Sequence, residues 1–102
     1  MNYKFNFPAI FLIGPTASGK TKLSLSLSKE FPVEIISVDS AMVYKGLDIG
    51  TSKPPRKIRE AYPHHLIDIR TPEQDFDLGL FLEETAKALK KIREKNKLPL
   101  FV

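Results

Sequence analysis

The sequence predicts an α/β fold of the P-loop NTPase-like, three-layer type, with helices on both faces of a parallel sheet. One observation is a phosphate-binding loop: residues 14–21 read GPTASGKT and fit the pattern G-x-x-x-x-G-K-[ST] at every fixed position. Another is that short apolar runs alternate with segments of helical length, the order typical of parallel strands joined by crossover helices. The 102 residues, 42% of them apolar and 27% charged, suit one globular domain.

Each position of the loop has a chemical reason. The glycines let the main chain approach phosphate oxygens closely, the lysine supplies a positive charge to the terminal phosphate, and the threonine hydroxyl can ligate Mg²⁺. The loop alone does not distinguish a diphosphate from a triphosphate. The residues expected to bind the diphosphate or nucleotide are Gly14, Pro15, Thr16, Ala17, Ser18, Gly19, Lys20 and Thr21.

A buried strand before the loop and a helix after it are both expected. Residues 9–13 (AIFLI) are wholly apolar, as in a parallel strand covered on both faces. Residues 23–27 (LSLSL) alternate as a strand would, but we predict a helix from Lys20 to about Phe31, because free N–H groups at a helix N-terminus bind phosphate. One stripe of that helix would hold Leu23, Leu27 and Phe31, with the small Ser24 and Ser28 beside it allowing close approach to the sheet.

The second predicted strand, residues 33–38 (VEIISV), leads to an acidic residue. A helix between two strands makes them parallel, so Asp39 and Ser40 are expected at the same carboxyl edge as the phosphate loop, where open α/β sheets bind ligands. Residues 39–44 predict a cap and a short helical turn, ended by Gly46. By position alone, Asp39 suits a general base, a helix cap or a Mg²⁺ ligand acting through water.

The middle of the chain is basic and contains both histidines. We expect residues 45–55 to form an ordered loop. Four cations then lie within seven residues; a solvated face is the favoured interpretation over a contact with nucleic-acid phosphates, and they are Lys53, Arg56, Lys57 and Arg59. Residues 64–69 (HHLIDI) predict a short strand, whose adjacent histidines point to opposite faces and do not share a metal ion.

The last third of the chain predicts a long helix and a strand. Asp77 suits an N-cap for a helix over about 78–95, on which Glu83 and Lys87 are spaced as an i, i+4 pair. Residues 98–102 (LPLFV) predict a third strand between the first two, giving the strand order 2-3-1. The apolar stripe of the helix comprises Leu78, Phe81, Leu82, Thr85, Ala86, Leu89 and Ile92.

Composition excludes several classes of protein. The chain has no cysteine and therefore no disulfide framework. Residues 5–13 are too short and too interrupted, by Asn6 and Pro8, for a secretory signal, and no apolar run approaches the roughly 20 residues that span a bilayer. We expect a cytoplasmic protein with no membrane association and no evident protein partner. A net charge of +4 permits a nucleic-acid partner without requiring one.

Four segments in this order and spacing carry a resemblance that covers most of the chain. They are GPTASGKT at 14–21, VEIISVDSAMVY at 33–44, KGLDIGTSKP at 45–54 and PHHLIDI at 63–69. Together they resemble the tRNA dimethylallyltransferases, also called tRNA isopentenyltransferases, which prenylate an adenosine beside the anticodon. A generic P-loop protein shares only the first segment.

The resemblance implies a reaction and roles for its residues. The loop would hold dimethylallyl diphosphate through residues 16–21, with Mg²⁺ and Lys20 stabilising the departing pyrophosphate. Asp39 would accept the proton of the attacking adenine amine. The target adenosine of the tRNA, turned out of its stack, would contact Asp39, Ser40, Ala41 and Met42.

The family continues beyond the third strand with a Gly-Gly-Thr segment and a long helical region that binds tRNA. We therefore expect residues 1–102 to be the N-terminal part of a P-loop prenyltransferase domain, not fully active alone. Three alternatives stay open. They are a P-loop small-molecule or nucleoside kinase using ATP, a prenyltransferase acting on free adenine nucleotides, and a nucleotide-binding module without turnover.

Overall fold

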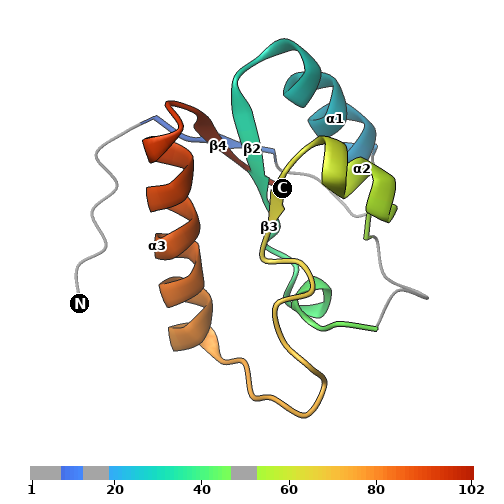
Figure 1. The fold of residues 1–102 in the computed structure, drawn as a ribbon, viewed down its shortest axis with the longest axis vertical. Helices are drawn as coiled ribbons and strands as arrows, with labels where there is room; N and C mark the ends of the chain where they lie inside the picture. Colours follow the sequence, from blue (N-terminus) through green and yellow to red (C-terminus); the bar gives the residue numbers. More distant parts are fainter. Residues whose placement is uncertain (1–7, 13–18, 47–52) are drawn as a thin grey trace.

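Four short strands form one parallel sheet in the computed structural model, which describes residues 8–12, 19–46 and 53–102. Figure 1 shows this sheet between the helices. All four predicted strands are present, and each is shorter than expected within the described residues. The strands are β1 (Ile10–Phe11), β2 (Val33–Ile36), β3 (His64–His65) and β4 (Leu98–Phe101).

The strand order is β1-β4-β2-β3. The predicted order 2-3-1 is wrong for the sheet as a whole, because it omits β3, which pairs with β2 through Ile35 and Ile36. The last strand along the chain, β4, does lie between β1 and β2. The predicted strand over residues 64–69 is confirmed at His64 and His65 only, and it adds to the edge of β2.

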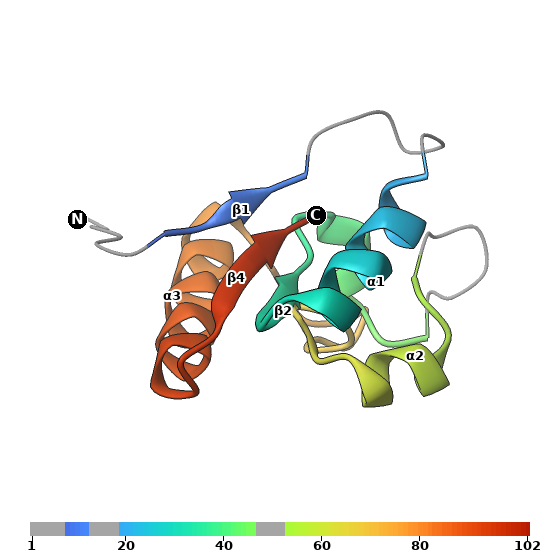
Figure 2. The same ribbon diagram turned by 90° about the horizontal axis from the view of Figure 1, so that it is seen from above.

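Helices cover the two faces of the sheet, as the three-layer prediction requires (Figures 1 and 2). On one face, Val33, Ile35 and Leu100 form a buried cluster against which Leu27 of α1 (Lys20–Glu30) packs. On the other face, Ile36 is buried with residues of α3 (Leu78–Glu94). The remaining helical elements are η1 (Ser40–Val43), a single 3₁₀ turn, and α2 (Arg56–Ala61). None of the described helices is both long and apolar enough to cross a membrane.

The helix predicted after the phosphate loop is confirmed, against the strand-like alternation of its leucines and serines. Its predicted stripe is partly wrong. Leu23 and Phe31 are 49% and 52% exposed, whereas Ser24 is 2% exposed. The reason is steric: the small Ser24 lets the helix approach the sheet, so the face centred on Ser24 and Leu27 is the one that packs.

The long helix also follows the prediction with one correction at its start. Thr85, Leu89 and Ile92 are buried as expected, together with Ala88, which the predicted stripe left out. Leu78 is 72% exposed, because it is the first residue of the helix. The apolar face of α3 therefore begins about one turn later than the sequence pattern indicates.

Candidate functional site

The N-terminus of α1 is the described part of the phosphate loop, because Gly14, Pro15, Thr16, Ala17 and Ser18 lie outside the described residues. Gly19 has φ 83°, a left-handed conformation that favours glycine, and its carbonyl accepts from the amide of Leu23 at 3.1 Å. Lys20 is the first helical residue. The backbone of Thr21 lies in the first helical turn.

The start of α1 differs from that of α3. The Asp77 carboxylate caps α3 by accepting from the amide of Leu80 at 2.9 Å, which confirms the predicted N-cap. Among the described residues, α1 has no side-chain cap and no acidic residue in its first turn. Its amide groups and positive dipole end are thus suited to an anion.

Asp39 follows β2 at the carboxyl edge of the sheet, as predicted. The β2–β4 pairing continues beyond the strands. The amide of Val38 donates to the carbonyl of Val102 at 3.0 Å, and the amide of Val102 donates to the carbonyl of Ile36 at 3.0 Å. Asp39 itself is exposed. Because β1 and β2 point the same way, the chain leaves both strands at one edge, toward α1 and toward η1 respectively.

The turn after Asp39 has the predicted helical character. The carbonyl of Asp39 accepts from the amide of Met42 at 3.1 Å, and the amide of Asp39 donates to the hydroxyl of Ser37 at 3.3 Å. The same Ser37 hydroxyl lies 3.2 Å from the sulfur of Met42. Ser40 and Ala41 complete the turn, so all four predicted adenosine-contacting residues lie in one short segment.

A largely apolar pocket lies between α1 and this turn. Ser24 lines it from the helix, and Met42 lines it from the turn. The pocket therefore joins the segment that follows the phosphate loop to the segment that follows Asp39. Its other lining residues are Ile35, Ser37, Pro54, His64, Ile67 and Val102.

Lys53 and Arg59 bind one carboxylate instead of forming part of a solvated face. The ammonium of Lys53 lies 2.7 Å from one oxygen of Asp68, and the guanidinium of Arg59 lies 2.6 Å from the other. Lys53 also donates to the carbonyl of Tyr44 at 2.6 Å, and its side chain is 2% exposed. The prediction of a solvated face thus fails for these two cations and holds for Arg56 and Lys57, which are exposed.

Burial alone would raise the pKa of Asp68. The hydrogen bonds and charges of Lys53 and Arg59 outweigh that effect and hold the pKa below its ordinary value. Sequence reasoning missed this cluster. A hint was present, since Asp68 is the single acidic residue in the apolar run HHLIDI, but only the fold shows which cations reach it.

Residues 68–70 donate backbone hydrogen bonds to the end of η1, and we call this segment the frame of the turn. The amide of Asp68 donates to the carbonyl of Met42 at 3.0 Å. The amides of Ile69 and Arg70 donate to the carbonyl of Val43 at 2.8 and 2.9 Å. Residues 68–70 therefore hold the carbonyls at the end of the turn that begins beside Asp39.

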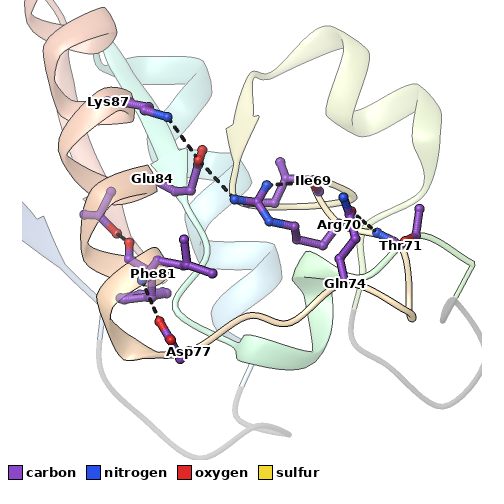
Figure 3. Close-up of polar contacts among 10 residues, drawn as sticks. Ile69, Arg70, Thr71, Gln74, Asp77, Phe81, Glu84 and Lys87 are labelled. Atoms are coloured by element: carbon purple, nitrogen blue, oxygen red, sulfur yellow. Dashed lines mark hydrogen bonds and ion pairs between the residues drawn. The ribbon is translucent and has the colours of Figure 1, made fainter.

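Arg70 ties this frame to α3, as Figure 3 shows. Its guanidinium lies 3.3 Å from the carboxylate of Glu84, which Lys87 approaches at the same distance. The partner of Lys87 is thus Glu84 at i, i+3 and not the predicted Glu83. Arg70 also lies over the ring of Phe76, 5.5 Å from its centroid.

The two histidines lie on β3 and take separate partners. His65 contacts the buried carboxylate of Glu34 at 2.7 Å, whereas His64 bonds to the carbonyl of Tyr62 and lines the pocket on the α1 side. Burial is the main cause that lowers the pKa of His64. No group of three metal-ligating side chains occurs within the described ranges 8–12, 19–46 and 53–102.

The comparison that decides the family is a match between residues 42–102 and the model of the IPP transferase family. The chain belongs to the IPP transferase family. Curated relatives agree. A tRNA dimethylallyltransferase of Acidithiobacillus ferrooxidans is 50% identical over 93% of this chain, and one of Nitrosococcus oceani is 52% identical over 93%. This chain spans about 30% of the length of either relative.

Solved structures of the family share the fold. A tRNA delta(2)-isopentenylpyrophosphate transferase from Staphylococcus epidermidis is 44% identical, with a TM-score of 0.84 over 92% of this chain and 31% of its own. A eukaryotic dimethylallyltransferase acting on tRNA is 34% identical, with a TM-score of 0.85 over 92% of this chain and 23% of its own. The P-loop NTPase-like parallel α/β fold is therefore confirmed.

Proposed function

We propose that this protein transfers a dimethylallyl group from dimethylallyl diphosphate to the exocyclic N6 of an adenosine next to the tRNA anticodon, releasing pyrophosphate. The observation that carries the proposal is membership of the IPP transferase family, whose model matches residues 42–102. Relatives named tRNA dimethylallyltransferase support both the prenyl donor and the RNA acceptor.

The phosphate loop binds the diphosphate in this proposal. Residues 14–21, except Pro15, supply backbone amide donors, Thr16 to Thr21 contact the prenyl donor, and Lys20 is a catalytic residue that neutralises charge on the departing pyrophosphate. Support comes from α1, whose N-terminus has a left-handed Gly19 and, in the described part of the chain, no acidic residue in its first turn.

The transfer needs no reactant besides the prenyl diphosphate and the adenosine. The N6 amine attacks the allylic carbon, a C–N bond forms, and the bond from that carbon to the diphosphate oxygen breaks. The electron pair leaves with pyrophosphate, and the nitrogen loses one proton. Asp39 accepts this proton, since it is exposed at the edge of the sheet where the chain leaves β2, the edge at which it also leaves β1 toward α1.

Mg²⁺ is the cofactor that we propose. The described residues contain no cluster of three acidic or histidine ligands, so the diphosphate and the Thr21 hydroxyl would hold the ion, in keeping with the preference of Mg²⁺ for substrate phosphates. When bound, it would neutralise charge on the leaving group.

Contacts to the acceptor RNA are assigned to the turn after β2. We propose that Asp39, Ser40, Ala41 and Met42 contact the target adenosine, because they form one turn at the carboxyl edge and Met42 lines the pocket beside α1. The protein would act in the cytoplasm, on tRNA.

The experiment is a titration with dimethylallyl diphosphate, pyrophosphate and ATP in parallel, with Mg²⁺ present, observed through the backbone amide NMR signals of Gly14 and of residues 16–21. Saturation by the prenyl diphosphate at a lower concentration than by ATP is the expected result. Tighter binding of ATP would instead favour a kinase or NTPase.

A further inference from the structure

We propose that Lys53 is a positioning residue that, through Asp68 and Tyr44, fixes the turn carrying Asp39 at the edge of the sheet. The positioning role follows from contacts within the protein. The effect of Lys53 on catalysis rests on the proposed function. The structure gives three reasons. The turn accepts hydrogen bonds from residues 68–70, Lys53 contacts both Asp68 and Tyr44, and α1 packs against the sheet through other residues.

The turn after Asp39 is weak by itself. A single 3₁₀ turn such as η1 has few internal hydrogen bonds, and the bond between the amide of Met42 and the carbonyl of Asp39 is one of these. The carbonyls of Met42 and Val43 accept instead from residues 68–70, at 2.8–3.0 Å. The position of the turn therefore depends on the segment around Asp68.

That segment has an unusual backbone held in place by its side-chain contacts. Asp68 has φ 57°, a left-handed conformation uncommon for residues other than glycine. Its carboxylate contacts Lys53 and Arg59, and the neighbouring Arg70 is bound to Glu84 of α3. Several contacts thus hold a conformation that the chain alone would rarely adopt.

Lys53 connects the two ends of this frame. Its ammonium donates both to the Asp68 carboxylate, at 2.7 Å, and to the carbonyl of Tyr44, at 2.6 Å. Tyr44 directly follows η1, and its bridge to Arg70 continues the pairing of the turn with the frame. The buried ammonium of Lys53 therefore links Tyr44, which follows the turn, to Asp68, whose amide donates to the carbonyl of Met42.

Direct contact of Lys53 with RNA does not explain these features, because a side chain that is 2% exposed cannot reach a phosphate. The N-terminus of α1 is anchored elsewhere, by Ser24 and Leu27 against the sheet. Loss of Lys53 should therefore disturb the Asp39 turn and leave diphosphate binding in place.

The first test compares Lys53→Met with Lys57→Met in the intact protein. Methionine keeps the length of the lysine stem and removes the charge, and Lys57 is an exposed cation of the same basic stretch. We expect Lys53→Met to lower kcat for prenyl transfer about 10- to 100-fold through misplacement of the turn. KM for dimethylallyl diphosphate should change less than about 2-fold, and Lys57→Met should match the wild type.

A second test observes the turn without relying on transfer. Asp68→Asn keeps a residue type that tolerates the left-handed region and weakens the bonds to both cations. Both Lys53→Met and Asp68→Asn should shift and broaden the ¹³C-methyl NMR signal of Met42, assigned with Met42→Leu, while the amide signal of Gly19 stays in place.

The outcomes separate this inference from the proposed function. If the wild type transfers a prenyl group and Lys53→Met transfers it equally fast with an unchanged Met42 signal, the positioning role is wrong. Equal losses of activity in Lys53→Met and Lys57→Met would also overturn it, in favour of general attraction of RNA by positive charge. If the wild type transfers nothing, the proposed function fails, and the Met42 signal alone decides the positioning role.

Discussion

Asp39 is the residue on which the chemistry of the proposed reaction depends. Its place directly before η1 would also suit a helix cap, since its carbonyl accepts from the amide of Met42 in that turn. Asparagine caps a helical turn as well as aspartate but cannot accept a proton as a carboxylate does. The substitution of Asp39 by asparagine therefore separates the two roles.

We predict that Asp39→Asn lowers the rate of prenyl transfer about 100- to 10,000-fold, the contribution typical of a general base. Binding of dimethylallyl diphosphate should not change, because we propose residues 14–21 for that contact. Steady-state kinetics and a donor titration check both quantities, with the exposed Asp75→Asn as the control. Full activity in Asp39→Asn would leave Asp39 only a structural role.

Lys20 is expected to contribute to donor binding. A bond between its ammonium and a phosphate is charge-assisted, worth about 1.5–3 kcal/mol, so Lys20→Met should weaken the binding of pyrophosphate about 10- to 100-fold. Isothermal titration calorimetry measures this. Lys22→Met, an exposed lysine in the same helix, should bind as the wild type does. Equal affinity of Lys20→Met and the wild type would contradict the assignment.

At the scale of single residues, sequence patterns predict which residues carry the chemistry. They do not predict which residues distant in sequence contact each other. The positions of Lys20 and Asp39 follow from a motif and from the polarity of parallel strands. Lys53 contacts Asp68 although its own sequence neighbourhood indicates an exposed basic stretch, and only the fold shows that this cation is buried. Pairing over such a separation leaves no periodic signal.

Among the elements, α3 offers a direct test of a predicted boundary. The Asp77 carboxylate accepts from the amide of Leu80, so Asp77→Ala should lower the free energy of unfolding by about 1 kcal/mol. Urea denaturation checks this value. Asp75→Ala, two residues earlier and exposed, should change stability by less than about 0.5 kcal/mol. A larger loss of unfolding free energy in Asp75→Ala than in Asp77→Ala would show that Asp77 is not the N-cap.

Glu34 joins several elements at the other end of the sheet. Its fully buried side chain on β2 contacts His65 of β3, and Lys95 and Lys97 between α3 and β4 lie 3.3 and 3.6 Å away. Burial alone would raise the pKa of Glu34. The hydrogen bond from His65 and the contact with Lys95 outweigh it, so the pKa lies below the ordinary value of 4.5.

A lowered folded-state pKa fixes the sign of the pH dependence. The stabilisation by Glu34 is fully present above its unfolded-state pKa, near 4.5, and is lost as the pH falls through the lower folded-state pKa. Glu34→Gln should therefore be less stable than the wild type by about 1–3 kcal/mol at pH 7, and the difference should shrink below about pH 4.5. Thermal unfolding from pH 3 to 7 measures it, and a constant difference would contradict it.

The elements also show where sequence reasoning succeeds and where it stops. The helix over Lys20–Glu30 is predicted only because a phosphate loop requires one, since its leucines alternate like a strand. The face that it buries is not predictable in the same way: Ser24 faces the sheet and Leu23 does not, because close packing selects the smaller side chain. Similarly, β3 covers only His64 and His65 of the predicted strand 64–69, the two residues that pair with Ile35 and Ile36 of β2.

For the whole molecule, the arrangement of strands brings the chemistry to one edge. The order β1-β4-β2-β3 places the exits of β1 and β2 on either side of β4, toward α1 and η1. The chain spans about 30% of the curated relatives that it matches, and this edge lies within that share. The proposed donor-binding loop and the proposed base are thus both part of this chain, so their roles in transfer can be tested by substitution.

The most direct measurement is mass spectrometry of the nucleosides of tRNA after incubation of the intact protein with dimethylallyl diphosphate and Mg²⁺. We expect one adenosine beside the anticodon to gain the mass of a C₅H₈ unit, pyrophosphate to appear in equal amount, and Asp39→Asn to abolish most of both. No modified adenosine, together with phosphoryl transfer from ATP to a small molecule, would show that the protein is a kinase and not a prenyltransferase.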